Sequence, residues 1–221
     1  MIARLDGSNP YAWPYDGRLD GSSIALVICG AQRDLVAASA DAATVAAHLA
    51  EVARSVRRVG GLVVWVRHGG RDGARRPTAS LPARTADGWQ LVHELPPGDA
   101  LVDAAGWDGC FGSDLDHTLR SRAAAIDGWC RVVLGGYASE ITVDSTVRTL
   151  NDRGHECLVL TNGCAPLDLA LGARAHASVT MSGGIFGALD TCQAVTRLLA
   201  SLPDPVPDPF PTSLQEVPAC P

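Results

Sequence analysis

Short, continuous runs of apolar residues alternate along the chain with longer segments in which apolar residues recur at helical spacing. A continuous apolar run is typical of a strand that is covered on both faces, as strands in parallel sheets are. The runs predict strands at residues 24–29, 62–67, 100–104, 131–134, 157–160 and 178–181. The helical spacing predicts helices at residues 41–58, 113–126, 139–153 and 189–202.

Strands that alternate with helices predict an α/β domain: a three-layer α/β/α sandwich with a mainly parallel sheet and Rossmann-like topology. We expect residues 23–202 to form this domain, preceded by an N-terminal arm over residues 1–22. Residues 203–221 form a proline-rich tail that either drapes over the domain or contacts a partner. Ser113 and Ser139 are placed to cap the two middle helices.

Composition narrows the classes of function. The chain has 221 residues, of which 47% are apolar and 19% charged, as is usual for a globular protein. No apolar run is long enough to span a membrane, and the N-terminal residues have no apolar stretch of the kind a signal peptide needs. The net charge is −6 and the basic residues are scattered, which argues against a nucleic-acid surface. We therefore expect a cytoplasmic protein with neither membrane nor nucleic-acid partners.

Two residue types carry chemical information. The seven cysteines are odd in number and form no CxxC pair, so we expect buried free thiols in a reducing compartment. All 18 basic residues are arginine, and the chain therefore has no lysine.

In a parallel sheet the ligand site lies beyond the carboxyl ends of the strands. The loops expected at that edge are residues 30–34, 67–71, 105–111 and 135–142.

Several segments near these loops resemble one superfamily, and they occur in the same order over roughly residues 10–200. They are PYAWPYDGRLDGSSIALVICGAQRDL, DGCFGSDLDHTL, GGYASEITVDSTVRTLNDRGHECLVLTNGCAPLD and MSGGIFG. Together they resemble the isochorismatase-like cysteine hydrolases, and most of all the biuret hydrolases and ureidoacrylate amidohydrolases. Within the first segment, Gln32 and Asp34 match the second half of the family's D-M-Q-x-D-F pattern.

The resemblance implies hydrolysis of amide-like C–N bonds through a thioester. A Cys at a helix start attacks the carbonyl, an Asp after the first strand takes its proton, and a Lys stabilises the charges. Carried over to this chain, the Cys falls on Thr142, the Asp on Gly30 and the Lys on Ala104 or Ala105. None of these side chains can replace the one it matches, so we expect the conventional mechanism to be absent.

By the same resemblance, the Tyr137–Ala138 peptide is expected to be cis, with the N–H groups of Ala138 and Thr142 free to bind a carbonyl or carboxylate. Thr142 has a structural alternative as a helix-start residue with a local hydrogen bond. Trp107 and Tyr137 either line a pocket for a planar ligand or simply pack.

Arg67, at the end of a strand, either pairs with a ligand carboxylate or forms an ordinary ion pair. Asp108, His68 and Thr142 are the candidates for a replacement catalytic site, although a loop histidine is usually solvated. Cys110 and Cys29 lie close by and are expected to be core residues.

Two functions fit these observations. The first is a family member without hydrolytic activity that binds a small carbonyl- or amide-type molecule or serves as an assembly subunit. The second is an enzyme with a rebuilt site for a small amide, carbonyl or enol-ether substrate. We expect no cofactor and no metal, because the histidines lack ligand spacing and no glycine-rich phosphate loop is present. A homo-oligomer, dimer or tetramer, is expected from the resemblance.

Overall fold

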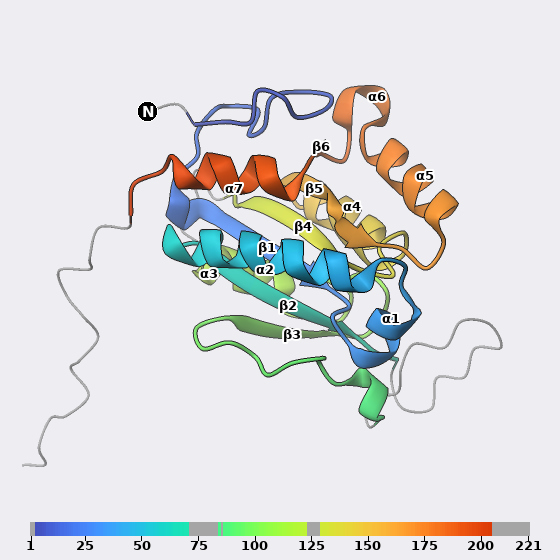
Figure 1. The fold of residues 1–221 in the computed structure, drawn as a ribbon. Helices are drawn as coiled ribbons and strands as arrows, with labels where there is room; N and C mark the ends of the chain where they lie inside the picture. Colours follow the sequence, from blue (N-terminus) through green and yellow to red (C-terminus); the bar gives the residue numbers. More distant parts are fainter. Residues whose placement is uncertain (1–2, 71–83, 85, 123–128, 205–221) are drawn as a thin grey trace, which may run out of the picture.

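A six-stranded sheet with all neighbouring strands parallel forms the centre of the molecule (Figure 1). The computed structural model describes residues 3–70, 84, 86–122 and 129–204. The strand order is β3-β2-β1-β4-β5-β6. The strands are β1 (Ile24–Cys29), β2 (Leu62–His68), β3 (Ala100–Ala104), β4 (Arg131–Tyr137), β5 (Glu156–Ala165) and β6 (Ala188–Asp190). The helices are α1 (Arg33–Ala38), α2 (Ala42–Arg58), α3 (Leu115–Arg122), α4 (Thr142–Asp152), α5 (Leu169–Val179), α6 (Met181–Gly184) and α7 (Cys192–Ala200), with short 3-10 turns η1 (Gly21–Ser23) and η2 (Asp87–Trp89).

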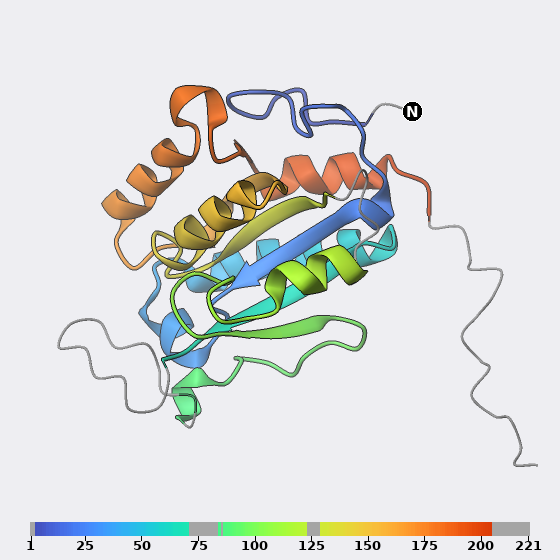
Figure 2. The same ribbon diagram turned by 180° about the vertical axis from the view of Figure 1, so that it is seen from behind.

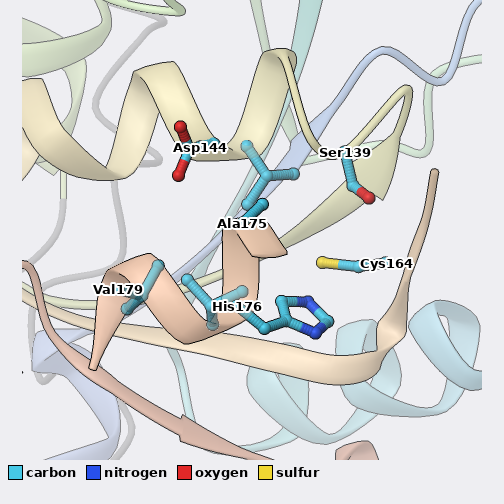
Figure 3. Close-up of a pocket in the computed structure, with 8 residues that line it drawn as sticks. Ser139, Asp144, Cys164, Ala175, His176 and Val179 are labelled. Carbon is cyan, nitrogen blue, oxygen red and sulfur yellow. The ribbon is translucent and has the colours of Figure 1, made fainter. Parts of the chain in front are cut away.

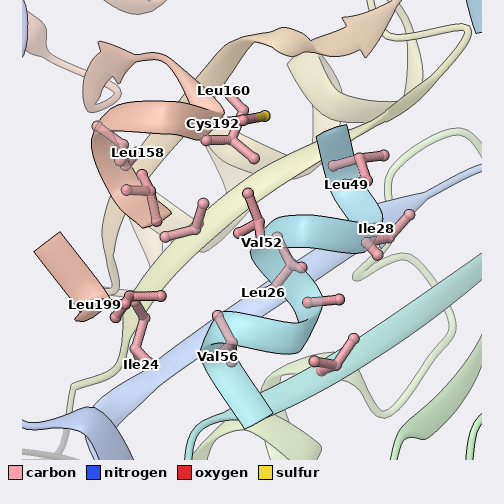
Figure 4. Packing of buried hydrophobic residues seen from close by; sticks show 14 of the residues in the cluster. Ile24, Leu26, Ile28, Leu49, Val52, Val56, Leu158, Leu160, Cys192 and Leu199 are labelled. Atoms are coloured by element: carbon pink, nitrogen blue, oxygen red, sulfur yellow. The ribbon is translucent and has the colours of Figure 1, made fainter. Parts of the chain in front are cut away.

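Helices cover both faces of the sheet. Helices α2 and α7 pack on one face, and α3 and α4 on the other, as Figures 1 and 2 show from opposite sides. Alternate residues of β1 enter the two cores: Leu26 faces α2 and α7, whereas Val27 faces α3 and α4. Figure 4 shows the first core, in which leucine and valine side chains of α2 interdigitate with those of the sheet and α7. Burial on both faces is the reason why the strands are continuously apolar. The predicted three-layer fold is confirmed.

One predicted strand is wrong. Residues 178–181 end α5 and begin α6, and the sixth strand is instead β6, where the start of the last helix was expected. The Asp168 side chain caps α5 by accepting from the N–H groups of Ala170 and Leu171. Because Gly172 and Val179 are the only buried residues of α5, the helix shows little apolar periodicity, and the β-branched stretch at its end resembles a strand.

The start of α4 also differs from the prediction. Ser139 does not cap the helix: its N–H donates to the carbonyl of Ala165, and α4 begins at Thr142. The carboxylate of Glu140 accepts from the N–H groups of Leu167 and Asp168, so it holds the connection between β5 and α5. The loop before α4 is therefore fastened to β5 and the segment after it.

The N-terminal segment packs onto the domain. Trp13 is fully buried, and short bridges join Leu5 to Trp13 and Asn9 to Leu189 of β6. At the other end Asp204 pairs with Arg58 of α2 at 2.7 Å. The proline-rich tail beyond Asp204 lies outside the described residues. The helix predicted at residues 113–126 is observed as α3, and its last predicted residues also lie outside them.

The cysteines of the described residues are free and buried, as expected. Cys220 falls outside the described part of the chain. None of the helices in the described part is long and apolar enough to cross a membrane.

Candidate functional site

Gly30, the position matched to the family's Asp, lies in a closed part of the carboxyl edge of the sheet. Its φ of +68° is in the left-handed region, and its N–H donates to the carbonyl of Val66 at 2.9 Å. A Cβ at this position would lie 2.9 Å from the carbonyl oxygen of Tyr137 and 3.0 Å from Cδ1 of Leu35. Both distances are shorter than ordinary van der Waals contacts. A side chain would therefore require the backbone of β4 to move.

Thr142, the position matched to the family's Cys, is fully buried in the first turn of α4. Its hydroxyl donates to the carbonyl of Tyr137 at 2.7 Å, and its N–H donates to the carbonyl of Ala138 at 2.9 Å. Its methyl group faces Gly30, because a Cβ on the glycine would lie 3.6 Å from Cγ2. The hydroxyl proton is directed to a backbone carbonyl, and the described hydrogen bonds of Thr142 include no side-chain base.

The backbone around Ala138 differs from the expectation in two respects. The cis peptides of the described residues are Asn9–Pro10 and Trp13–Pro14, so the expected cis bond at Tyr137–Ala138 is wrong. The chain turns instead through a left-handed Ala138 with a φ of +48°. The Ala138 N–H donates to Oγ of Ser39 at 2.9 Å. Since the Thr142 N–H is also engaged, the expectation of two free N–H groups is wrong as well.

Ala104 and Ala105, the positions matched to the family's Lys, form part of the backbone network of this edge. Ala104 is fully buried, and its carbonyl accepts from the N–H of Gly69 at 3.1 Å. The N–H of Ala105 donates to the carbonyl of Phe111 at 2.8 Å. Neither position carries a charge.

His68 lies opposite Ala104 in the β2–β3 register and is fully buried, so the expectation of a solvated histidine is wrong. Its Nδ1 lies 3.1 Å from the carbonyl of Gly106, and since a carbonyl only accepts, Nδ1 carries the proton. Nε2 has no hydrogen-bond partner among the described residues. Burial lowers the pKa of His68 to about 4, and the hydrogen bond to Gly106 offsets only part of this shift. The imidazole is therefore neutral and a weak base at pH 7.

Gln32 and Asp34, which match the family's Q-x-D, hold this edge together. The amide of Gln32 accepts from the N–H of His68 at 2.6 Å and donates to the same residue's carbonyl at 3.1 Å. It thereby fixes the end of β2 against the loop that follows β1. The carboxylate of Asp34 lies so close to Gly88 that a Cβ there would be 2.0 Å away.

Arg67 forms an ion pair. Its guanidinium donates to both carboxylate oxygens of Asp103, at 2.7 and 2.9 Å, and stacks 3.6 Å from the ring centroid of Trp89. A bidentate pair of this kind is among the strong protein ion pairs. The guanidinium N–H groups that could have bound a ligand carboxylate are instead bonded to the carboxylate of Asp103.

Asp108 is also engaged within the chain. One carboxylate oxygen accepts from the N–H of Cys110 at 2.9 Å, and the other accepts from the hydroxyl of Thr149 at 2.8 Å. Cys110 is buried, and burial raises its thiol pKa to about 12. Cys29 is fully buried, and burial raises its pKa to about 12 as well. Neither cysteine carries a thiolate at neutral pH.

The two aromatic candidates pack against the core on the α2 side of the sheet. Tyr137 is buried there, and burial raises its pKa, whereas Trp107 is partly buried at the edge of the same cluster. The structure thus brings Gly30, Tyr137 and Thr142 together in one packed region. Asp108, His68 and Thr142 each bond to different partners, and none of the described hydrogen bonds joins one of the three to another.

A cavity of about 340 Å³ opens beside this packed region, between the start of α2, the end of β5 and α5. Its walls combine small apolar residues with polar groups, and the polar lining residues are Asp41, Thr44, His48, Ser139, Thr161, Asn162, Cys164 and His176. It continues into a small pocket that Ser139, Cys164 and His176 also line. Figure 3 shows these three side chains directed towards a common space.

The electrostatics of this cavity are simple. Among the described residues that line the cavity, Asp41 is the one acid, and there is neither Arg nor Lys. The lining also contains two histidines, His48 and His176. Burial lowers the pKa of His176, and nearby Asp144 opposes this only partly. Burial raises the pKa of the Cys164 thiol, while a hydrogen bond with Ser139 is among the smaller opposing effects. Both groups are neutral at pH 7.

Sequence reasoning did not predict this cavity. The spacing of His48 and His176 does not indicate that they meet, because one lies on α2 and the other on the unpredicted α5. The polar pair Thr161 and Asn162, directly after the apolar run of β5, is the one signal that could have pointed to it. Among the residues that the structure describes, no group of three or more His, Cys, Asp or Glu is arranged to hold a metal ion.

Comparison with known proteins agrees with the motifs. The family model described as Isochorismatase domain matches residues 24–189. The uncharacterized isochorismatase family protein YwoC of Bacillus subtilis (strain 168) is 29% identical over 154 residues, covering 65% of this chain and 78% of that protein. The ureidoacrylate amidohydrolase RutB of Stutzerimonas stutzeri (strain A1501) is 38% identical over 78 residues, which span 34% of this chain and 29% of that protein.

Solved structures show the same fold. A cysteine hydrolase from Pseudomonas syringae pv. phaseolicola 1448A has a TM-score of 0.72 at 18% identity, covering 86% of this chain and 96% of that one. An isochorismatase family protein from Burkholderia thailandensis has a TM-score of 0.69 at 23% identity, covering 81% and 97%. With the domain match spanning the sheet from β1 into β6, the chain belongs to the isochorismatase family.

Proposed function

We propose that this isochorismatase-family protein does not hydrolyse amides at the inherited position and instead binds a small carbonyl- or amide-type molecule. The observation that carries the proposal is the packing at the inherited position. Gly30 has no room for a side chain, Thr142 donates its hydroxyl to the Tyr137 carbonyl, and Ala104 is fully buried.

Hydrolysis through an acyl intermediate needs an activated nucleophile, a base that takes its proton, and groups that stabilise the oxyanion. An alcohol is a poor nucleophile unless a base accepts its proton, and the described contacts of Thr142 include none. The chain has no lysine, and Arg67 is paired with Asp103. The Ala138 N–H, an expected oxyanion donor, is bonded to Ser39.

The alternative of a rebuilt catalytic site finds no specific support in the contacts. His68 is enclosed, with its pKa lowered by burial, and Asp108 bonds to Thr149 and Cys110. A general base must come within hydrogen-bond reach of the group it deprotonates. Neither residue is bonded to Thr142.

Binding finds support in the neighbouring cavity. Its volume of about 340 Å³ falls in the range of small-molecule sites, and its walls are partly apolar with a few polar groups. The expected homo-oligomer and the alternative role as an assembly subunit stay predictions.

The test is an activity assay of the purified full-length chain against biuret, ureidoacrylate, nicotinamide and isochorismate, with an active ureidoacrylate amidohydrolase run in parallel. We expect no turnover above the buffer background for any of the four. A Thr142→Cys variant sharpens the test, because it restores the sulfur without a base or a cation, and it too is expected to be inactive. Turnover of any substrate by the wild-type chain would overturn the proposal.

A further inference from the structure

We infer that the cavity between α2, β5 and α5 is the binding site, and that it takes a small neutral molecule with N–H donors, of the primary-amide class. This inference rests on the proposed function and names the place and the ligand chemistry. The site lies one strand away from the inherited position, because its floor is formed by Ser139 and by Cys164 of β5.

The loop between β4 and α4 separates the two regions. Thr142, at the end of this loop, lies against Gly30 at the inherited position, whereas Ser139 lines the cavity. The Ser139 N–H donates to the carbonyl of Ala165, so this part of the loop is fastened to β5. The cavity therefore exists although the inherited position is closed.

Hydrogen-bond acceptors face the cavity. Nδ1 of His48 lies 2.9 Å from the carbonyl of Asn162, so Nδ1 is the donor in this hydrogen bond and Nε2 is the ring atom left to accept one from a ligand. Asp41 precedes α2 in a left-handed conformation, and its carboxylate does not cap the helix. These two groups can receive the N–H donors of a ligand.

The same geometry supplies donors for a ligand carbonyl. Because Asp41 does not cap α2, the first-turn N–H groups of this 17-residue helix are not satisfied by its side chain. Thr44 also lines the space and adds a hydroxyl donor. A primary amide matches both sets, since it has one carbonyl acceptor and two N–H donors.

A carboxylate is a poor match. The cavity lining contains neither Arg nor Lys among the described residues, and its one acid, Asp41, would repel an anion. His176, with its pKa lowered by burial, supplies no positive charge at pH 7. The neutral thiol of Cys164 makes reversible binding, without acyl transfer, the expected outcome.

The experiment compares benzamide with benzoate, which have the same ring and differ in amide against carboxylate. Isothermal titration of the full-length chain at pH 7.5 is expected to show saturable binding of benzamide. Benzoate is expected to bind at least about tenfold more weakly, which corresponds to roughly 1.4 kcal/mol. Binding of benzoate equal to or tighter than that of benzamide would overturn the inferred ligand class.

Two pairs of variants place the binding. Ala173→Trp fills the cavity from an exposed position on α5, and its control Ala47→Trp adds the same bulk at an exposed position on α2 outside the lining. We expect at least a tenfold loss of benzamide affinity in Ala173→Trp and less than a twofold change in Ala47→Trp. Equal affinity in the two variants would overturn the assignment of the site.

The second pair guards against a misfolded tryptophan variant. His48→Ala removes the acceptor, and we expect benzamide affinity to fall about fivefold, as for one hydrogen bond. His117→Ala, at an exposed position on α3, is the control and should bind as the wild type does. An unchanged affinity in His48→Ala would contradict the inferred role of His48.

The outcomes for this site are separable from those of the proposed function. Ammonia release from benzamide would contradict the non-hydrolytic function, and the tryptophan pair would still decide where benzamide binds. Absence of benzamide binding would overturn the inferred site, including the case in which light scattering shows an oligomer whose second copy covers the cavity. The activity assay on the four family substrates would be unaffected by that result.

Discussion

The two sides of the loop between β4 and α4 have opposite character. On one side, Gly30, Tyr137 and Thr142 pack so closely that a single added methyl group would clash. On the other, Ser139, Cys164 and His176 border a cavity. On the closed side, the hydroxyl and the N–H of Thr142 both donate to backbone carbonyls. On the open side, Ser139, Cys164 and His176 are directed towards a common space (Figure 3). Under the proposed function, the position inherited from the family carries no reaction, and the cavity on the other side of the loop holds the ligand.

The largest effect on stability is expected from a substitution that adds a side chain at Gly30 on the closed side. Gly30→Ala places a Cβ in a left-handed conformation and against the Tyr137 carbonyl. Left-handed strain costs roughly 1–2 kcal/mol and overpacking roughly 1–3 kcal/mol, so we expect a loss of about 4 kcal/mol in the free energy of unfolding. Urea denaturation measures it.

The matched control is Gly183→Ala. Gly183 also has a positive φ, +81°, but nothing lies within 4 Å of its Cβ position. Only the backbone strain applies, so the loss should be about 1 kcal/mol. Equal losses in the two variants would show that the region around Gly30 is not tightly packed.

The next effect is a pH dependence that belongs to His68. Its folded-state pKa of about 4 lies below the ordinary value of 6.5, so the folded chain binds the proton less readily than the unfolded chain. This contribution to stability is fully present above pH 6.5 and is lost as the pH falls towards 4. The lowering corresponds to about 3 kcal/mol.

The measurement is the free energy of unfolding at pH 7.5 and pH 4.5 for the wild type and for His68→Leu. We expect the wild type to lose more stability than the variant between the two pH values, because only the wild type has this titrating ring. An equal loss in both proteins would contradict the enclosed, neutral imidazole.

A smaller effect is expected at the rim of the closed side. Arg67→Gln removes the bidentate pair with Asp103 and the stacking on Trp89. Because both side chains are partly exposed, we expect a loss of about 1 kcal/mol in the free energy of unfolding. Arg4→Gln, which breaks an exposed pair with Asp6, is the control and should change stability by less than about 0.5 kcal/mol. An equally small change in Arg67→Gln would mean that the pair does not help to hold the closed side.

The smallest effect is expected on the open side. Leu169 lines the cavity and is 66% exposed. Leu169→Ser should change the free energy of unfolding by less than about 0.5 kcal/mol, because little apolar surface is withdrawn from water there. A loss above 2 kcal/mol in thermal or urea denaturation would mean that the cavity wall is part of the core.

The sequence predicts much of the sheet because strands that are buried on both faces consist of continuous apolar runs. The run at residues 24–29 and the exact bounds of β3 are examples. The sequence does not predict α5, because so few of its side chains are buried that the apolar residues show no helical spacing. The motif resemblance leads us to expect the family's Asp and Cys positions at Gly30 and Thr142, but the packing of these two residues depends on the carbonyl of Tyr137 and on Leu35, which no local pattern specifies. The cavity could not be predicted either, because its walls come from helices that are distant along the chain.

The most direct test of the account is the rate of ammonia release from biuret and nicotinamide by the wild-type chain and by Thr142→Val, which removes the buried hydroxyl. The account predicts that both proteins stay at the buffer background, since the described contacts of the hydroxyl are with the backbone carbonyls of Tyr137 and Ala138. Hydrolysis by the wild type that disappears in Thr142→Val would contradict it.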